Sequence, residues 1–288
     1  MERFTSSTRK QQPSKNLGYD MNNYVRITLE IKGETHSRDF GRALLSVFCN
    51  FAPSLMPDLL DSGEDGPHRT PFDDLETAMN QWGKTFSLDM RGGDPDAYWG
   101  ARWKRKQEPR YNAYFMHGIF NRRNFLTPST LSFKAKWNPK VDWAELFLRL
   151  CNACDTRAAL MHHLTPRELS SAISDFAYGI IAPTLNTRFH DLRFPGITWA
   201  MMFGAEFLDR VDARAIKDAG FGVRQVGTGY LVQVTDSLLD VLKRYDHFCE
   251  RRETLLAFVP ASVLRDTSDD EVLAWLAAQP SSPSPDFL

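Results

Sequence analysis

Alternation of apolar and polar residues is clearest near the start of the chain, in residues 24–31. The apolar members of this segment are Val25, Ile27, Leu29 and Ile31. Successive side chains of a strand point to opposite faces of a sheet, so a period of two predicts a half-buried strand. Residues 1–20 hold almost no large apolar side chains and are predicted to form a disordered tail, because they cannot offset the entropy lost on ordering.

Helical spacing follows this strand. From Ser37 to Phe51 large apolar residues recur three and four positions apart, which predicts an amphipathic helix with Ser37 as its N-cap. The same kind of stripe predicts helices over residues 141–154 and 213–218. A further helix is expected from Asp236 or Ser237 to about residue 256.

Further strands are predicted in the middle and the C-terminal half of the chain. Residues 111–120 and 130–137 indicate an antiparallel pair joined around residues 121–124, residues 157–164 indicate another strand, and the glycine-turned segment 222–234 indicates a hairpin. The expected fold is therefore α+β, with packed helices on a mixed or largely antiparallel sheet. No linker composition divides the chain, so residues 21–278 are expected to form a single domain, followed by a disordered tail at 279–288.

Charge is distributed unevenly along this pattern. Residues 53–74 combine Pro, Gly and several acids, which predicts a long acidic surface loop. Residues 101–140 carry ten basic residues against one acid, Glu108, which predicts a basic face on the hairpin. Over all 288 residues the net charge is only -1, so the chain as a whole has no field that selects nucleic acid or anionic lipid. No apolar run is long enough for a secretory signal or a membrane span, and we expect a cytoplasmic protein with no membrane partner.

The pattern closest to a metal site is Cys151-x-x-Cys154 followed by His162-His163. A CxxC pair inside an amphipathic helix places cysteine in the core stripe, adjacent histidines in a strand point to opposite faces, and no second CxxC follows. We therefore expect these four residues to be packing residues and expect no cofactor or metal. No sequence motif of a known nucleophile is present, which favours a protein that is not an enzyme.

A series of short segments in the second half of the chain resembles a known family. The segments are residues 186–199 (NTRFHDLRFPGITW), 202–204 (MFG), 207–211 (FLDRV) and 229–235 (GYLVQVT). They resemble the type VI immunity family of bacterial proteins, and the resemblance covers roughly residues 20–256. It implies a cytoplasmic scaffold that binds and blocks a cognate effector toxin, and it transfers no site residues.

Two charged surfaces are the candidates for such a partner. The acidic candidates are Asp58, Asp61, Glu64 and Asp65, and the basic and aromatic candidates are Arg102, Trp103, Lys104 and Arg105. A toxin with a basic cleft favours the first surface and an acidic toxin favours the second. Two alternatives remain open, namely a nucleic-acid-binding module built on residues 101–140 and a hydrolase that uses His162 or His163. The identity of the toxin and the oligomeric state do not follow from the sequence.

Overall fold

The structure is a computed structural model that describes residues 23–51, 53–61, 70–86, 97–98, 100–118, 128–167 and 193–264. Residues 22–267 group into one compact unit. The two predicted tails, 1–20 and 279–288, and the predicted turn at 121–124 lie outside the described residues.

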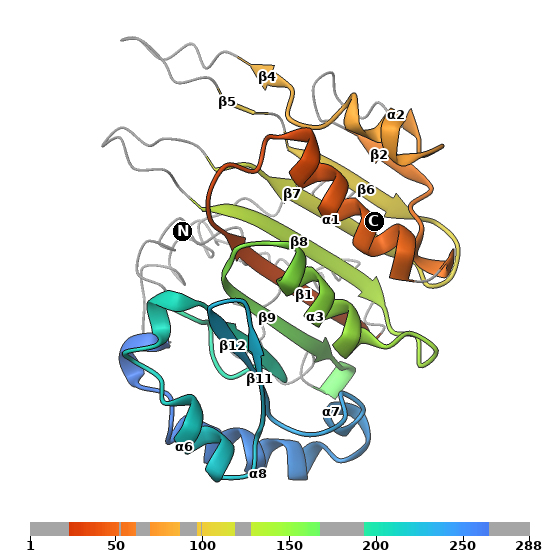
Figure 1. The fold of residues 1–288 in the computed structure, drawn as a ribbon. Helices are drawn as coiled ribbons and strands as arrows, with labels where there is room; N and C mark the ends of the chain where they lie inside the picture. Colours follow the sequence, from red (N-terminus) through yellow and green to blue (C-terminus); the bar gives the residue numbers. More distant parts are fainter. Residues whose placement is uncertain are drawn as a thin grey trace, which may run out of the picture. The chain divides into compact units, whose positions relative to one another are not determined.

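A ten-stranded sheet forms the centre of this unit (Figure 1), and all of its strand pairs are antiparallel. Its strand order is β11-β12-β10-β9-β1-β8-β7-β6-β2-β3. The strands are β1 (Tyr24–Ile31), β2 (Leu59–Asp61), β3 (Thr70–Pro71), β6 (Ala101–Arg105), β7 (Tyr111–Met116), β8 (Ser129–Lys136), β9 (Thr156–Leu164), β10 (Ala200–Phe203), β11 (Gly222–Val226) and β12 (Gly229–Gln233). A separate two-stranded sheet pairs β4 (Thr85–Phe86) with β5 (Ala97–Tyr98).

The described helices complete an α+β fold, as the sequence predicts. The α-helices are α1 (Arg38–Phe51), α2 (Leu75–Met79), α3 (Trp143–Ala153), α6 (Ala213–Asp218), α7 (Asp240–Lys243) and α8 (Tyr245–Leu256). The short 3-10 helices are η1 (Pro53–Leu55), η4 (Ala205–Phe207) and η5 (Ala261–Val263).

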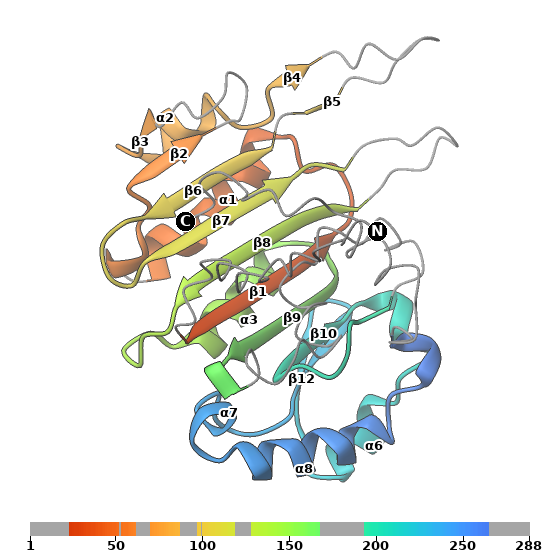
Figure 2. The same ribbon diagram turned by 180° about the vertical axis from the view of Figure 1, so that it is seen from behind.

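Helices α1 and α3 lie on the same face of the sheet (Figures 1 and 2). Phe48 of α1 packs on Trp103 of β6 and on Phe133 of β8, with ring centroids 5.5 and 5.6 Å apart. Trp143 of α3 reaches the same Phe133 ring at 6.3 Å. Aromatic side chains of this size bury large apolar areas, so this face holds much of the core. We call it the helix-covered face.

The residues between these core positions belong to the other face of the sheet, because side chains alternate along a strand. On the central strand β1, Ile27 lies opposite Phe133 on the helix-covered face, whereas Arg26, Thr28 and Glu30 point away from it. We call this second side the polar face. The β1–β9 pairing also shifts its register between Glu30 and Ile31, the signature of a β-bulge.

Several sequence predictions are confirmed. Strand 24–31 is β1, and the helix predicted from Ser37 is α1, whose Phe40 N–H donates to Ser37 Oγ at 3.2 Å. The predicted antiparallel pair is β7 and β8. The hairpin at 222–234 is β11 and β12.

Two predictions are wrong in part. Segment 53–74 contains β2 and β3 in addition to loop, because Leu60 is buried and β2 pairs with β6. Such short edge strands are too brief to show a period of two. The helix predicted up to residue 256 is two helices, α7 and α8, which are separated at Arg244 by non-helical backbone angles (φ -130°, ψ 49°). The Arg244 guanidinium binds both carboxylate oxygens of Asp240, at 2.8 and 2.9 Å, and closes the short α7.

Candidate functional site

Strand β6 divides the basic run that the sequence offered as a candidate surface. It pairs with β7 from Ala101 to Arg105, so its successive side chains alternate between the two faces. Trp103 belongs to the helix-covered face, where it contacts Phe48. Arg102 and Lys104 therefore lie on the polar face.

Trp103 is a correction to the sequence-based surface. Only 1% of the residue is exposed, so it is part of the core and is unavailable to a partner without local unfolding. Arg105 is also largely engaged: its Nη1 donates to the Met56 carbonyl oxygen at 2.7 Å and lies 3.6 Å from Asp58 Oδ1.

The acidic and basic candidates are neighbours and not two separate surfaces, because β2 pairs directly with β6. Asp58 accepts a hydrogen bond from the Lys106 N–H at 2.7 Å in addition to its contact with Arg105. Asp61 lies opposite Arg102 in the β2–β6 register. Asp58 and Asp61 thus offset nearby basic charge, while Glu64 and Asp65 lie outside the described residues.

The polar face carries a line of cations across four neighbouring strands. The cross-strand register aligns Lys104 of β6 with Asn112 of β7, Asn112 with Lys134 of β8, and Lys134 with Arg26 of β1. Neighbouring strands are about 4.8 Å apart, so this line spans about 14 Å. We call these four residues the basic row, and it contains no acidic residue.

Like charges that face each other across strands are unfavourable, which makes the basic row costly by itself. Arg26 is half-buried, and its Nε has no hydrogen-bond partner. Burial is the main cause that lowers the pKa of Arg26 to about 10. Two aromatic rings lie beside the cations of this face: Lys134 Nζ is 4.3 Å from the Tyr24 ring centre, and the Arg102 guanidinium is 5.1 Å from that of Tyr114.

Sequence reasoning had missed Arg26 and Lys134 as partners of Lys104. Lys104 lies 78 residues and Lys134 lies 108 residues after Arg26 along the chain, and only the strand order brings the three together. The alternation of residues 24–31 did indicate that Arg26 faces away from Ile27. The register with β8 was the missing information.

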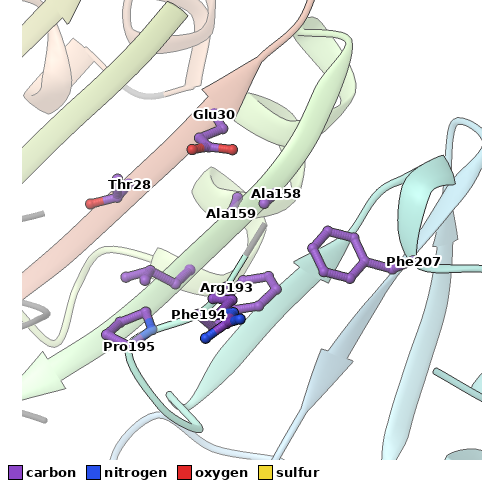
Figure 3. A pocket seen from close by; sticks show the side chains of 9 residues that line it. Thr28, Glu30, Ala158, Ala159, Arg193, Phe194, Pro195 and Phe207 are labelled. Atoms are coloured by element: carbon purple, nitrogen blue, oxygen red, sulfur yellow. The ribbon is translucent and has the colours of Figure 1, made fainter. Parts of the chain in front are cut away.

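A small pocket lies on the same polar face, beside the C-terminal half of β1 (Figure 3). Its volume is about 30 Å³. The lining residues are Thr28 and Glu30 of β1, Ala158, Ala159 and Leu160 of β9, the segment Arg193, Phe194 and Pro195, and Phe207 of η4. Most of the wall is apolar, and Glu30 supplies a carboxyl group.

The residues of the metal-like pattern are packed inside the fold. Cys151 and Cys154 are buried free thiols, and burial raises the pKa of Cys154 to about 12. His162 and His163 are fully buried: Nδ1 of His162 accepts the Trp199 N–H at 3.1 Å, and His163 stacks on Trp137 at 4.3 Å. The opposite orientation expected for adjacent strand residues therefore gives the two rings different neighbours.

Within the described ranges, no group of three or more His, Cys, Asp or Glu side chains could hold a metal ion. None of the helices in those ranges is both long and apolar enough to cross a bilayer.

Comparison with known proteins gives a distant similarity to a solved structure. No family model matches the chain, and no curated protein matches it. Among solved structures, the Pseudomonas aeruginosa T6SS protein PA0821 is similar with a TM-score of 0.46 and 15% sequence identity. The match covers 74% of this chain and 65% of that chain, so the present chain spans less than two thirds of that protein. The resemblance to the type VI immunity family stays a prediction from the sequence.

Proposed function

We propose that this chain is an immunity protein that binds a cognate effector toxin of a type VI secretion system in the bacterial cytoplasm and neutralises it by contact. The segments that resemble the immunity family indicate this class of partner. Among the described residues of these segments, Trp199 is a packing residue: it is 1% exposed and donates from Nε1 to Thr235 Oγ1 at 3.0 Å. The segments support a shared scaffold and do not mark the contact surface.

The observation that carries the binding role is the basic row. Three cations, Lys104, Lys134 and Arg26, are aligned across four strands and gather positive charge on a chain of net charge -1. Gathered positive charge accelerates association with an acidic surface and disfavours basic competitors. In this proposal the effector presents acidic side chains to the polar face, and the immunity protein performs no catalysis.

The test is co-expression of the chain with its adjacent gene product in a bacterial host, with growth and pull-down as readouts. The decisive variant is the double charge reversal K104E/K134E. We expect it to weaken the complex by at least about tenfold, because it replaces attraction by repulsion at two aligned positions. The matched control is K217E/K243E, which makes the same change in charge at two exposed lysines of α6 and α7.

Rescue by the wild type and by K217E/K243E, together with loss of rescue by a folded K104E/K134E, supports the proposal. Full rescue by K104E/K134E contradicts the assignment of the basic row, and toxicity that the wild type does not relieve contradicts the immunity role. Circular dichroism establishes whether each variant is folded.

A nucleic-acid-binding module is the second candidate, because cations beside tyrosine rings are also suited to phosphates and stacked bases. Its signature is different. Binding of wild-type protein to single-stranded DNA or RNA that falls steeply with salt, and that K104E/K134E abolishes, favours this candidate over the immunity role.

A further inference from the structure

The pocket on the polar face contains two buried acceptors that lack partners. Glu30 is 3% exposed and Thr28 is 4% exposed, and both line the pocket. Glu30 Oε1 and Thr28 Oγ1 have no hydrogen-bond partner. Buried polar groups are almost always hydrogen-bonded, since an unmet acceptor costs free energy, so this pair requires an explanation.

The nearby cations Lys32 and Arg157 contact Glu206 and form no ion pair with Glu30, and Glu206 Oε2 also has no hydrogen-bond partner. Glu206 Oε1 binds Lys32 Nζ at 2.7 Å and lies 3.8 Å from Arg157 Nε. Arg193 is at the rim of the pocket with its side chain exposed, where water screens its charge. Burial raises the pKa of Glu30 to about 7, the Arg157 charge opposes this shift, and Glu206 adds to it.

The size and the acceptors of the pocket restrict the ligand. A volume of about 30 Å³ admits a head group as small as an ammonium ion, whereas a planar guanidinium needs more room. A hard cation such as Ca²⁺ needs six or more oxygen ligands, and the pocket offers one carboxyl and one hydroxyl side chain. An ammonium group has three N–H donors and no acceptor, so it matches two unmet acceptors.

We propose that the pocket formed by Glu30, Thr28 and the apolar walls of β9, Phe194 and Phe207 binds a primary alkylammonium group. The ammonium donates to Glu30 Oε1 and to Thr28 Oγ1. The alkyl chain of the ligand packs on Leu160, Phe194 and Phe207 as it leaves the pocket. The same chemistry is present in a free amine and in a lysine side chain of a polypeptide.

Titration of the full chain with two probes tests this site without reference to any toxin. The probes are n-butylamine and Nα-acetyl-lysine N-methylamide, and the readouts are calorimetry and the ¹³C shift of the Glu30 carboxyl group. We expect binding of at least one probe at about pH 8, and E30Q should weaken it by about tenfold or more because a charge-assisted hydrogen bond is lost. T28V should weaken it less. The matched control E253Q, at an exposed position of α8, should bind as the wild type does.

The dependence on pH adds a second readout. The ammonium favours ionised Glu30, so affinity should rise about tenfold between about pH 6 and about pH 8 for a carboxyl whose pKa is about 7. This rise is measured on the wild type and holds as a test even if E30Q fails to fold.

Binding of the lysine probe alone identifies a polypeptide lysine as the source of the ligand, and binding of both probes identifies small amines as sufficient. Absence of binding by both probes, or binding that E30Q and pH leave unchanged, overturns the proposal and leaves the pocket as a water site. Neither result depends on the immunity role, so the two proposals fail separately.

Discussion

The two faces of the central sheet differ in the kind of side chain that they bury. On the helix-covered face, Phe133 lies among the rings of Phe48, Tyr111 and Trp143 and is fully buried. On the polar face of the same strands, Arg26 and the pocket acceptors have buried polar atoms without hydrogen-bond partners. Trp103 Nε1 on the helix-covered face also lacks a partner, so the two faces differ in the kind of group and not in its presence: large apolar contacts dominate one face, and a buried carboxyl, a hydroxyl and a guanidinium lie on the other.

This difference indicates where recognition belongs in the molecule. Helices α1 and α3 cover one face, whereas the acceptors of Glu30 and Thr28 on the other face gain hydrogen bonds when a donor binds. The polar face is therefore the better place for a ligand or a partner protein. Three predictions test the contrast, in order of decreasing effect.

The largest effect is expected from Phe133→Ala, which removes a fully buried ring from the helix-covered face. It should lower the free energy of unfolding by about 3–5 kcal/mol, through lost burial and the cavity left behind. The matched control is Ser132→Ala, at the neighbouring position on the polar face. This substitution should change the free energy of unfolding by about 1 kcal/mol at most. Urea denaturation measures both, and equal losses would remove the contrast between the faces.

An intermediate effect is expected at Glu30, and it depends on pH. The pKa of folded Glu30 is about 7 and that of an unfolded glutamate is 4.5, so the folded state holds a proton that the unfolded state releases between these values. The free energy of unfolding should therefore fall as the pH rises through this window, by roughly 3 kcal/mol in total. E30Q should remove this fall and be the more stable protein at pH 8.

His117 acts with the opposite sign and must be separated from Glu30. Burial, and then the charge of His36, lower the pKa of His117 to about 4 from 6.5. This histidine therefore makes stability rise with pH between those two values. Because His117 is present in both proteins, the difference between wild type and E30Q isolates Glu30. A difference that does not change with pH would show that Glu30 titrates normally.

The smallest effect is expected from Arg102→Ala on the polar face. Arg102 is exposed and its guanidinium lies 5.1 Å from the centre of the Tyr114 ring, so the loss in unfolding free energy should be about 0.5–1 kcal/mol. Thermal denaturation should place this variant close to the wild type. A loss as large as that of Phe133→Ala would assign Arg102 to the structural core.

Much of this fold could be predicted from hydrophobic spacing alone. The strand at 24–31 and the helix after Ser37 are long, and glycine marks the turn of the hairpin. The residue pattern within each of these segments is therefore enough to predict its secondary structure. The short strands β2 and β3 could not be predicted in this way, because two or three residues cannot display a period and their strand geometry depends on the pairing of β2 with β6 and of β3 with β2.

The candidate site could be predicted only in fragments. The sequence identified the basic run at 102–105, but it treated Trp103 and Arg105 as equivalent to Arg102 and Lys104, since β6 was not recognised as a strand. Once β6 is known, alternation separates them. The alignment of Lys104 with Lys134 and Arg26 depends on the register of three strand pairs, which is a property of the folded sheet and not of any local segment.

The alternation along β1 also has an evolutionary consequence. Ile27 and Leu29 face the helices, whereas Arg26, Thr28 and Glu30 of the same strand lie on the opposite face, so a substitution in the second set leaves the side-chain contacts of the first set in place. For the proposed immunity role, this arrangement would let the residues that face a partner change while the strand pairing is retained.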